Sequence, residues 1–430
     1  MAQLGNLGTS DSGGLDRFGP VSLSIEFKKD PLDPWEEPIA LTLNQVQQLI
    51  IVLDIHRFLP SVNLELQDSG GYLTHLFPDD RRMRKLHIQL GKLTTGNMDD
   101  SVLFSFDVWR RTPKSEGTFQ VHGLLDVDNF FSPEKIRSFN GTIKSTIQSI
   151  ADEIKADSTE ISSSLNYSKT LLQANWTNGQ FLRWMTQELI GNDSSSAFSC
   201  FLRCTTSEKI LVFKSLKDFQ KSKVKYILAP HPGALAHDTA VGGYTIVQPI
   251  LGWEIYDSGK LLGVTSKRKQ VFSYFNYSTG TYVADEVAVN GNTLTGTDYY
   301  SMTEYYSLDK SDSENEGVSI DTTGRSNAFT SNFQGRVLSS YHKNLFAMSK
   351  VWVTTWGLQD AAPGDVVDIQ KLDRQVPQQI AGLHYEGFWV IERVVHLVGN
   401  GFLTKLLLIR NGVTSGDSNT LIRASQWKKA

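Results

Sequence analysis

The sequence predicts an α+β protein that is mostly antiparallel β-sheet, with β-rich regions at both ends and an α+β region between them. Apolar and polar residues alternate with a period of two from Val21 to about Phe131, which is typical of strands with one buried face. A helical spacing of apolar residues begins after Gly141. From Pro363 to Val413 the pattern returns to strands and tight turns. Together these three observations indicate the fold class.

The N-terminal β-region is a succession of short alternating runs. They are Ser22–Phe27, Val62–Leu66, Leu86–Leu90, Val102–Trp109 and Phe119–Val127. Polar turns between the runs favour an antiparallel barrel or sandwich. The run Gln47–Leu59 also has a spacing that fits a buried helix, but its β-branched residues Ile50–Val52 and the closing Pro60 favour a strand. Residues 1–20 are rich in Gly and Ser and are expected to form a flexible arm.

Two helices and a pair of strands are predicted in the middle region. The first helix is indicated by isoleucines at helical spacing, namely Ile143, Ile147, Ile150 and Ile154. A second helix begins near Thr177, with Gln180 at the capping-box position, and ends before Gly191. Its apolar face is formed by Phe181, Leu182, Met185 and Leu189. Ser199–Arg203 and Lys209–Phe213 are expected to be paired strands.

The following region is β-rich at first and then polar and helical. Ala229–Tyr306 is aromatic and contains Gly and Asn turn signals, and Trp253–Lys260 is typical of a hairpin. Asp309–Ser326 is acidic and is expected to be an exposed loop. Asn327–Met348 has helical spacing and leads into a strand at Lys350–Trp356.

The C-terminal β-region has the most specific pattern in the chain. Pro363-Gly364-Asp365 predicts a turn into an alternating strand that ends at Ile369. Gly387–His396 and Phe402–Gly412 are two β-rich runs on either side of Asn400-Gly401. Because Asn-Gly tolerates the positive φ of tight turns, these runs predict a hairpin.

In this order and spacing, the turn, the strand and the hairpin resemble the baseplate hub proteins of contractile-tailed bacteriophages. The same fold occurs in the N-terminal half of type VI secretion spike proteins. The helices and hairpin of the middle region resemble this family as well, as does the strand Pro60–Gln67 with the turn Asp68–Gly71 that follows it. The C-terminal residues that carry the resemblance are Pro363, Gly364, Asp365, Trp389, Val390, His396, Asn400, Gly401, Arg410, Asn411 and Gly412.

The resemblance implies two tail-tube-like β-barrel domains with an intervening α+β domain. The expected division is an arm at 1–20, a first barrel at 21–135, an α+β domain at 136–228, a β-rich continuation leading into the second barrel at 229–340, the second barrel at 341–415 and a tail at 416–430.

A structural function in a virion, at the tail baseplate of a contractile injection machine, is also implied, with synthesis in the host cytoplasm. Three chains would form a homotrimeric hub whose six barrels surround the DNA or effector channel and join the sixfold tail tube to the threefold spike. The expected partners are further copies of the chain, the spike, the tail-tube or tube-adaptor protein, the wedge proteins and the tape-measure protein. The resemblance implies no enzymatic activity and no cofactor.

Composition agrees with a globular protein and excludes several classes. Hydrophobic residues make up 40% of the 430 residues, and the net charge of −4 gives no general attraction to nucleic acid or to anionic membranes. The two cysteines, Cys200 and Cys204, exclude a disulfide-stapled scaffold and are interpreted as small core residues. The N-terminus lacks the pattern of a signal peptide, and no apolar run reaches membrane-spanning length, so stable membrane insertion is not expected.

Two motifs invite a catalytic or metal-binding interpretation. Asp68-Ser69-Gly70-Gly71 is similar to the nucleophile loop of trypsin-like proteases, in which the His and Asp of the triad precede the Ser on a two-barrel domain. Only 68 residues precede Ser69, so a turn is favoured. His231, His237 and Asp238 are potential metal ligands, but no further ligand clusters beside them in the sequence, so polar loop contacts are favoured. No catalytic, cofactor or metal site is therefore predicted.

Charged runs also have simpler explanations. The acidic pairs Glu36-Glu37, Asp79-Asp80 and Asp99-Asp100 could serve a glycosidase, yet such pairs are common in loops. The basic runs Arg81–Lys85 and Lys214–Lys225 lack interleaved aromatic residues, so a solvated face or a protein–protein rim is favoured over DNA binding. No specific nucleic-acid binding is expected.

Two alternatives from other classes stay open. One is a cell-wall-degrading tail protein, and the other is a carbohydrate-binding tail protein, because aromatic residues make up 10% of the chain. Most of these aromatic residues occupy alternating strand positions, which favours the core and interfaces over sugar-binding platforms.

Overall fold

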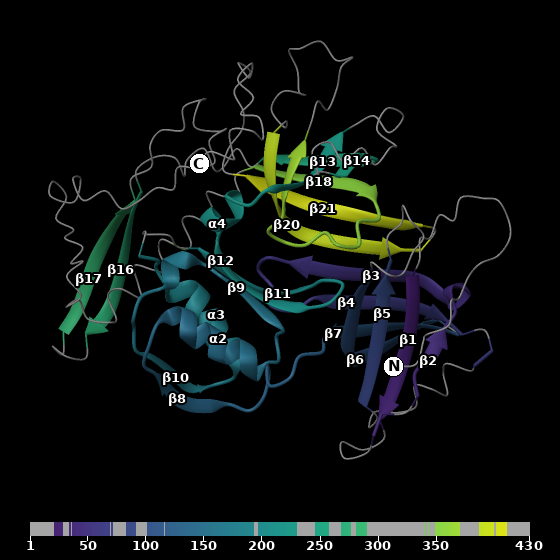
Figure 1. Cartoon of the computed structure of the whole chain (residues 1–430), viewed down its shortest axis with the longest axis horizontal. Coiled ribbons are helices and arrows are strands. Elements are labelled where there is room, and N and C mark those ends of the chain that lie inside the picture. The colour runs from purple at the N-terminus through teal and green to yellow at the C-terminus, as the bar shows by residue number, and fades with distance from the viewer. Residues whose placement is uncertain are drawn as a thin grey trace, which may run out of the picture.

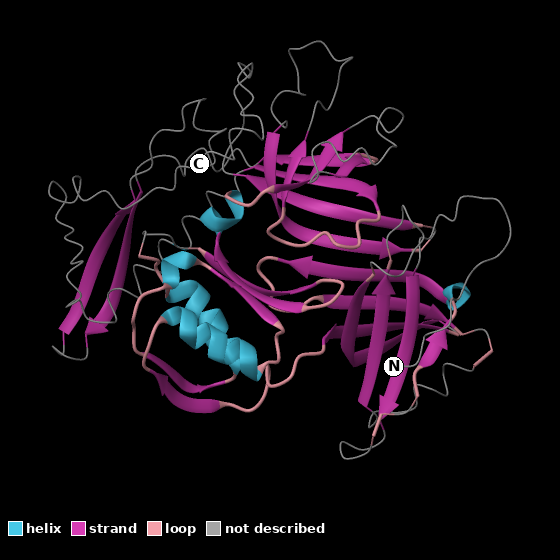
Figure 2. Ribbon diagram, viewed as in Figure 1, coloured by secondary structure: helices cyan, strands magenta, loops and turns pink. Residues whose placement is uncertain are grey.

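A computed structural model shows a mostly β protein whose main feature is one strongly curled, half-barrel sheet (Figures 1 and 2). The structure describes residues 21–28, 34–35, 37–68, 70–71, 83–91, 101–115, 117–192, 197–229, 246–257, 268–276, 281–289, 339, 343, 349–369, 387–399 and 401–410. The large sheet has 14 strands and is built from both ends of the chain. The expected mostly antiparallel β fold class is confirmed.

The N-terminal part of the large sheet is antiparallel throughout. Its strands are β1 (Val21–Lys28), β2 (Ile39–Leu41), β3 (Val46–Asp54), β4 (Ser61–Gln67), β5 (Met83–Leu90), β6 (Val102–Ser115) and β7 (Thr118–Leu125), with a short 3-10 helix, η1 (Leu43–Gln45), before β3. They lie in the order β3-β4-β7-β6-β5-β1-β2. Alternate residues such as Leu64, Leu66 and Ile88 are fully buried, as the period-two pattern predicts. The strand expected within Gln47–Leu59 is confirmed by β3.

The middle region is an α+β unit beside this sheet (Figure 1). Its elements are β8 (Lys135–Phe139), α2 (Ile143–Glu153), β9 (Ser158–Ile161), η2 (Ser163–Leu165), β10 (Leu171–Trp176), α3 (Asn178–Glu188), β11 (Phe198–Cys204), β12 (Lys209–Ser215) and α4 (Leu216–Gln220). β10 pairs with β8, and β11-β12-β9 form a three-stranded sheet. Both predicted helices are confirmed, and Ile143, Ile147 and Ile150 are fully buried.

The N-terminus of α3 has the capping box that the sequence predicts. The Thr177 side chain accepts a hydrogen bond from the backbone N–H of Gln180 at 3.2 Å, and the Gln180 side chain accepts one from the N–H of Thr177 at 3.0 Å. Two backbone donors that the helix leaves unpaired are thereby satisfied.

We expect Thr177→Ala to lower the free energy of unfolding by about 1 kcal/mol, because it removes a helix cap. Urea denaturation followed by circular dichroism measures the loss. Thr170→Ala, at an exposed loop position, is the matched control and should change the free energy of unfolding by less than about 0.5 kcal/mol. Equal losses in the two variants would contradict the role of the cap.

The C-terminal part of the large sheet contains both antiparallel and parallel pairs. Its strands are β13 (Val224–Ala229), β14 (Ile246–Pro249), β15 (Gly252–Asp257), β18 (Ser349–Trp356), β19 (Val366–Ile369), β20 (Gly387–Val398) and β21 (Phe402–Arg410). β13 lies parallel between β14 and β19, and β15-β18-β21-β20 are antiparallel neighbours. A separate antiparallel hairpin is formed by β16 (Arg268–Asn276) and β17 (Thr281–Val289).

The structure confirms two of the strand predictions for the C-terminal region. The C-terminal hairpin is confirmed by β20 and β21, and the strand at Lys350–Trp356 by β18. β15 pairs with β18, much later in the chain, so the described residues show no local hairpin at Trp253–Lys260. The acidic segment Asp309–Ser326, the arm at 1–20 and most of the helical segment Asn327–Met348 lie outside the described residues. The domain boundaries stay a prediction.

Within the described part of the chain, none of the helices has the length and apolar character needed to span a membrane.

Candidate functional site

The two ends of the chain meet at a junction between β3 and β20. Arg393–Val398 of β20 pair antiparallel with Leu49–Asp54 of β3, in an unbroken register of six residue pairs. On one face the pair His396 and Ile51 is fully buried, whereas on the other face the pair Val395 and Val52 is half-buried. Because this pairing joins the two parts of the large sheet edge to edge, it fixes their relative position.

Charged side chains reinforce the β3 end of the junction. Asp54, whose side chain is only 2% exposed, accepts a hydrogen bond from Arg393 Nε at 2.7 Å and forms an ion pair with Arg393 Nη2 at 2.6 Å. Its other carboxylate oxygen accepts the backbone N–H of His56 at 2.8 Å. A buried carboxylate held by a guanidinium and a backbone donor is satisfied only while both strands remain in this register.

A second buried carboxylate, that of Glu392, lies on β20 next to Arg393. Glu392, 6% exposed, accepts hydrogen bonds from Lys350 Nζ of β18 at 2.7 Å and lies 3.3 Å from His56 Nε2. Its backbone carbonyl accepts the N–H of Ile55 at 2.9 Å. Burial alone would raise the pKa of Glu392, but hydrogen bonds from His56 and Lys350 outweigh it and lower the pKa. Glu392 therefore connects β18, β20 and the turn after β3.

The turn at Pro363-Gly364-Asp365 packs against the middle region. Gly364 has φ +84°, and a Cβ on it would lie 2.5 Å from ring carbons of Phe219 in α4. Its N–H donates to the carbonyl of Ile391 at 2.8 Å, and the N–H of Ile391 donates to the carbonyl of Asp365 at 2.9 Å. Only glycine fits this position, because the backbone is left-handed and the Phe219 ring occupies the side-chain space.

Asp365 fixes the same turn through its side chain. Its Oδ2 atom accepts the N–H of Ala362 at 2.9 Å and Lys225 Nζ at 3.0 Å. The neighbouring Tyr226 hydroxyl, on β13, donates to Asp360 at 2.6 Å. The basic run that contains Lys225 is thus used within the protein and ties β13 to the turn before β19.

The remaining C-terminal signature residues pack between β20 and β21. Trp389 is fully buried under the Arg410 guanidinium, whose carbon lies 4.0 Å from the ring centroid. His396 is also fully buried, with Nδ1 3.2 Å from Thr404 Oγ1 and its ring 5.7 Å from that of Phe402.

Two further signature residues are placed by the same hairpin, and three are not described. Val390 is paired with Ile409 and fully buried, and Gly401 lies in the turn. Asn400, Asn411 and Gly412 lie outside the described residues. The signature residues that are described form the packing of the C-terminal sheet and of its contact with α4.

Burial of His396 makes stability depend on pH. Burial lowers the pKa of His396 to about 4, below its ordinary value of 6.5. The unfolded chain therefore binds this proton more readily than the folded one, so stability is complete above pH 6.5 and is lost as pH falls toward 4. We expect a loss of about 2 kcal/mol between pH 7.5 and pH 5 from this residue. Urea denaturation of the wild type and of His396→Gln at both pH values measures it. A pH dependence of equal size in the variant would contradict the prediction.

The structure describes few of the residues that invited a catalytic or metal-binding interpretation, so the absence of such a site stays a prediction. The turn Asp68–Gly71 is closed by a hydrogen bond from the N–H of Gly71 to the carbonyl of Asp68 at 3.2 Å, while Ser69 is not described. In the described ranges no three His, Cys, Asp or Glu residues are grouped as metal ligands. His231, His237, Asp238 and the acidic pairs, apart from Glu37, lie outside those ranges. Cys200 and Cys204 are buried in β11, and burial raises the pKa of both thiols.

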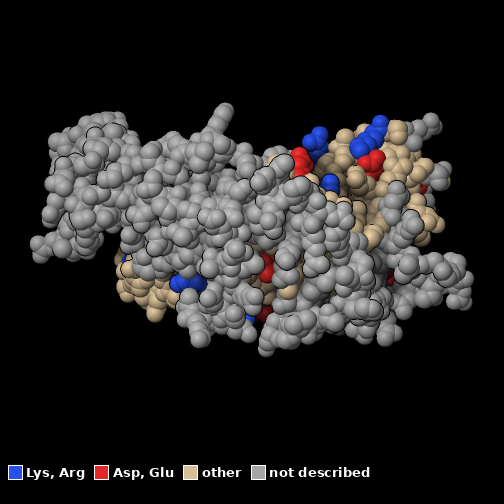
Figure 3. All heavy atoms as spheres, turned by 90° about the horizontal axis from the view of Figure 1, so that it is seen from above, with Lys and Arg blue, Asp and Glu red and all other residues tan. Residues whose placement is uncertain are grey.

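Two lysines of the basic run Lys214–Lys225 form ion pairs, Lys214 with Glu160 and Lys225 with Asp365. On the face shown in Figure 3, described Lys or Arg atoms lie beside Asp or Glu atoms at the upper right, whereas a group of Lys or Arg atoms at the lower left stands apart from acidic atoms. Arg81 and Arg82 are not described. The expectation that Lys214–Lys225 does not bind nucleic acid stays a prediction.

Sequence reasoning missed the ion pairs of the junction. Asp54 and Arg393 are far apart in the chain, and neither stands in a motif. Phe219, which packs on Gly364, was missed for the same reason. The sequence of β3 contains no signal for these pairs, because a strand's side-chain pattern does not specify which strand joins its edge.

No protein-family model matches the chain, and no curated protein matches it. Among solved structures, the prophage MuSo2 43 kDa tail protein from Shewanella oneidensis is similar at a TM-score of 0.48 and 11% identity, over 90% of this chain and 97% of that one. A tail protein from Neisseria meningitidis MC58 is similar at a TM-score of 0.47 and 11% identity, over 92% and 98%. The chain's structural neighbours are phage tail proteins and secretion-system components. One such component is the E. coli c3393 protein of the type VI secretion system, with a TM-score of 0.42 and 7% identity, over 86% of this chain and 74% of that one.

Proposed function

We propose that the chain is the central hub of a phage tail baseplate, a structural protein that joins the sixfold tail tube to the threefold spike. Three chains form the hub, and the channel for DNA or effectors passes through their centre. The partners of the hub are further copies of the chain, the spike, the tail-tube or adaptor protein, the wedge proteins and the tape-measure protein.

The observation that carries this proposal is the junction between β3 and β20. A single chain holds the two parts of the large sheet edge to edge through six residue pairs, and buried ion pairs fix the register. A ring of three such chains contains six of these parts, so a chain of this kind can face sixfold symmetry on one side and threefold symmetry on the other.

Two chains can associate by β-sheet pairing only through strand edges that are not already paired. In the described part of the large sheet, β2 pairs only with β1, and β15 pairs only with β18. An unpaired strand edge presents a row of backbone donors and acceptors that favours pairing with another chain. Trp253 on β15 is exposed, as are Leu251 beside it and Trp356 on β18. These strands and aromatic side chains supply the surface for contact between copies in the proposed ring.

The solution mass tests the oligomeric part of the proposal. Light scattering of the purified chain, alone and mixed with the tail proteins encoded beside it, should give a trimer of 3 × 48.0 = 144 kDa under at least one of these conditions. A mass of 48.0 kDa under all of them would overturn the hub proposal. A chain that is monomeric alone and trimeric with the spike protein would support it.

A further inference from the structure

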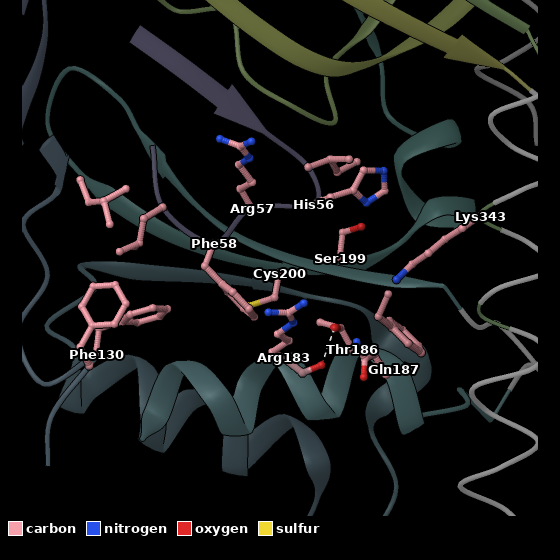
Figure 4. Close-up of a pocket in the computed structure, with 15 residues that line it drawn as sticks. His56, Arg57, Phe58, Phe130, Arg183, Thr186, Gln187, Ser199, Cys200 and Lys343 are labelled. Atoms are coloured by element: carbon pink, nitrogen blue, oxygen red, sulfur yellow. Dashed lines mark hydrogen bonds between the residues drawn. The ribbon is translucent and has the colours of Figure 1, made fainter. Parts of the chain in front are cut away.

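A cavity of about 630 Å³ lies between the N-terminal part of the large sheet and the middle region (Figure 4). The turn after β3 forms one wall with Ile55–Leu59, and α3 forms another with Arg183, Thr186 and Gln187. The start of β11, Phe198–Cys200, lies between them, and Lys343 reaches in from the C-terminal half. A cavity of this volume can hold a ligand of two or three residues.

The cavity is lined by cations without acidic partners. Arg57, Arg183 and Lys343 all line it, and none of the three is paired with a carboxylate among the described residues. The described lining contains no Asp or Glu. His56 also lines the cavity, and its Nε2 atom lies 3.3 Å from Oε1 of Glu392, which is not a lining residue. An excess of three positive charges over one concave surface attracts an anionic group.

Two polar side chains of the lining, the half-buried Lys343 and the buried Ser199, have no side-chain hydrogen-bond partner among the described residues. The Ser199 side chain is buried, yet its hydroxyl has no hydrogen-bond partner in the described structure. Burial also lowers the pKa of Lys343, because its ammonium group is desolvated with no opposing charge. The desolvated cation costs free energy that a bound oxyanion would recover, whereas the Ser199 hydroxyl is buried too deeply for a ligand to reach.

The rest of the lining is aromatic and apolar. Phe58 and Phe130 pack at 5.7 Å between ring centroids, and Phe131 meets Phe130 edge-on at 5.0 Å. Phe131 is 62% exposed, so part of this apolar wall is open. A ligand that fills the cavity therefore needs an apolar group beside its negative charge.

We propose that this cavity binds an acidic peptide segment of a partner protein, with its carboxylates at the cationic residues Arg57, Arg183 and Lys343 and a neighbouring apolar side chain against the exposed ring of Phe131. The proposal goes beyond the hub function and does not rest on it. A peptide is favoured over single-stranded nucleic acid because Phe58 and Phe130 pack against each other and Phe131 alone among the phenylalanines of the described lining has a largely exposed ring, whereas single strands stack successive bases on several open rings.

A labelled peptide tests the proposal with the full chain. The probe is fluorescein-labelled Glu-Phe-Glu-Leu-Glu-Phe, and its binding is followed by fluorescence anisotropy. We expect a Kd below about 1 mM, and no binding in that range for the neutral peptide Gln-Phe-Gln-Leu-Gln-Phe. Arg183→Gln should weaken binding about tenfold, since it removes a charge-assisted hydrogen bond.

Matched variants separate the cavity from general electrostatics and from folding. Lys144→Gln, at an exposed position of α2 outside the cavity, removes the same charge and should leave the Kd unchanged within about twofold. Ser199→Ala deletes an unpaired buried hydroxyl that the ligand does not reach, so it should leave the Kd unchanged within about twofold and thermal stability unchanged or higher.

Four outcomes would overturn the proposal. They are the absence of acidic-peptide binding, equal weakening by Lys144→Gln and Arg183→Gln, displacement of the peptide by inorganic phosphate at similar concentrations, and tighter binding of a ten-nucleotide single strand than of the peptide. The third would indicate a site for a free anion, and the fourth a site for nucleic acid.

Discussion

Gly364→Ala is expected to lower the free energy of unfolding by about 3 kcal/mol, in two parts. The residue has φ +84°, which costs an L-amino acid about 1 kcal/mol or more. The new Cβ would also lie 2.5 Å from Phe219, and such overpacking costs about 2 kcal/mol. Urea denaturation at fixed protein concentration measures the sum.

Two further variants separate these contributions. Gly71→Ala has a similar φ of +68° but nothing within 4 Å of the new Cβ, so it should lose only about 1 kcal/mol. Phe219→Ala removes the ring that Gly364 faces, and the double variant should lose clearly less than the two single losses added together. Additive losses would show that Gly364 and Phe219 do not depend on one another.

Arg393→Met should destabilise the junction by about 3 kcal/mol, because it leaves the buried Asp54 carboxylate without its cation. Chemical denaturation again provides the measurement. The matched control is Lys114→Met, which breaks the pair of Lys114 with Glu65 where the lysine is 44% exposed, and it should cost less than about 1 kcal/mol.

A second substitution at the junction tests the cause. Replacing both partners, Asp54→Leu with Arg393→Met, removes the unpaired charge as well as the pair, and it should recover part of the loss. If the double variant is less stable than Arg393→Met alone, the uncompensated charge of Asp54 is not the reason for the destabilisation.

Local patterns in the sequence predicted local structure well. The capping box at Thr177 and Gln180 depends on residues three apart, and the structure contains both of its hydrogen bonds. The β20–β21 hairpin was predictable for the same reason, since a short turn connects its strands. Interactions between residues a few positions apart can be predicted because both partners occur in the same short stretch of sequence.

Partners distant in sequence could not be predicted. A hairpin was expected at Trp253–Lys260, whereas Gly252–Asp257 pairs with β18, because strand patterns do not specify which edge they join. The contacts of β3 with β20 and of Gly364 with Phe219 depend on the whole fold. The family resemblance indicated two barrels but not the residues that join them, and the cationic cavity arises from segments that share no motif.

Negative-stain electron microscopy of the assembled chain tests the central claim most directly. Class averages viewed down the axis should show a closed ring with threefold symmetry and six similar densities around an open centre, two from each chain. A ring with any other number of chains, or isolated particles of single-chain size even with the neighbouring tail proteins present, would contradict the account.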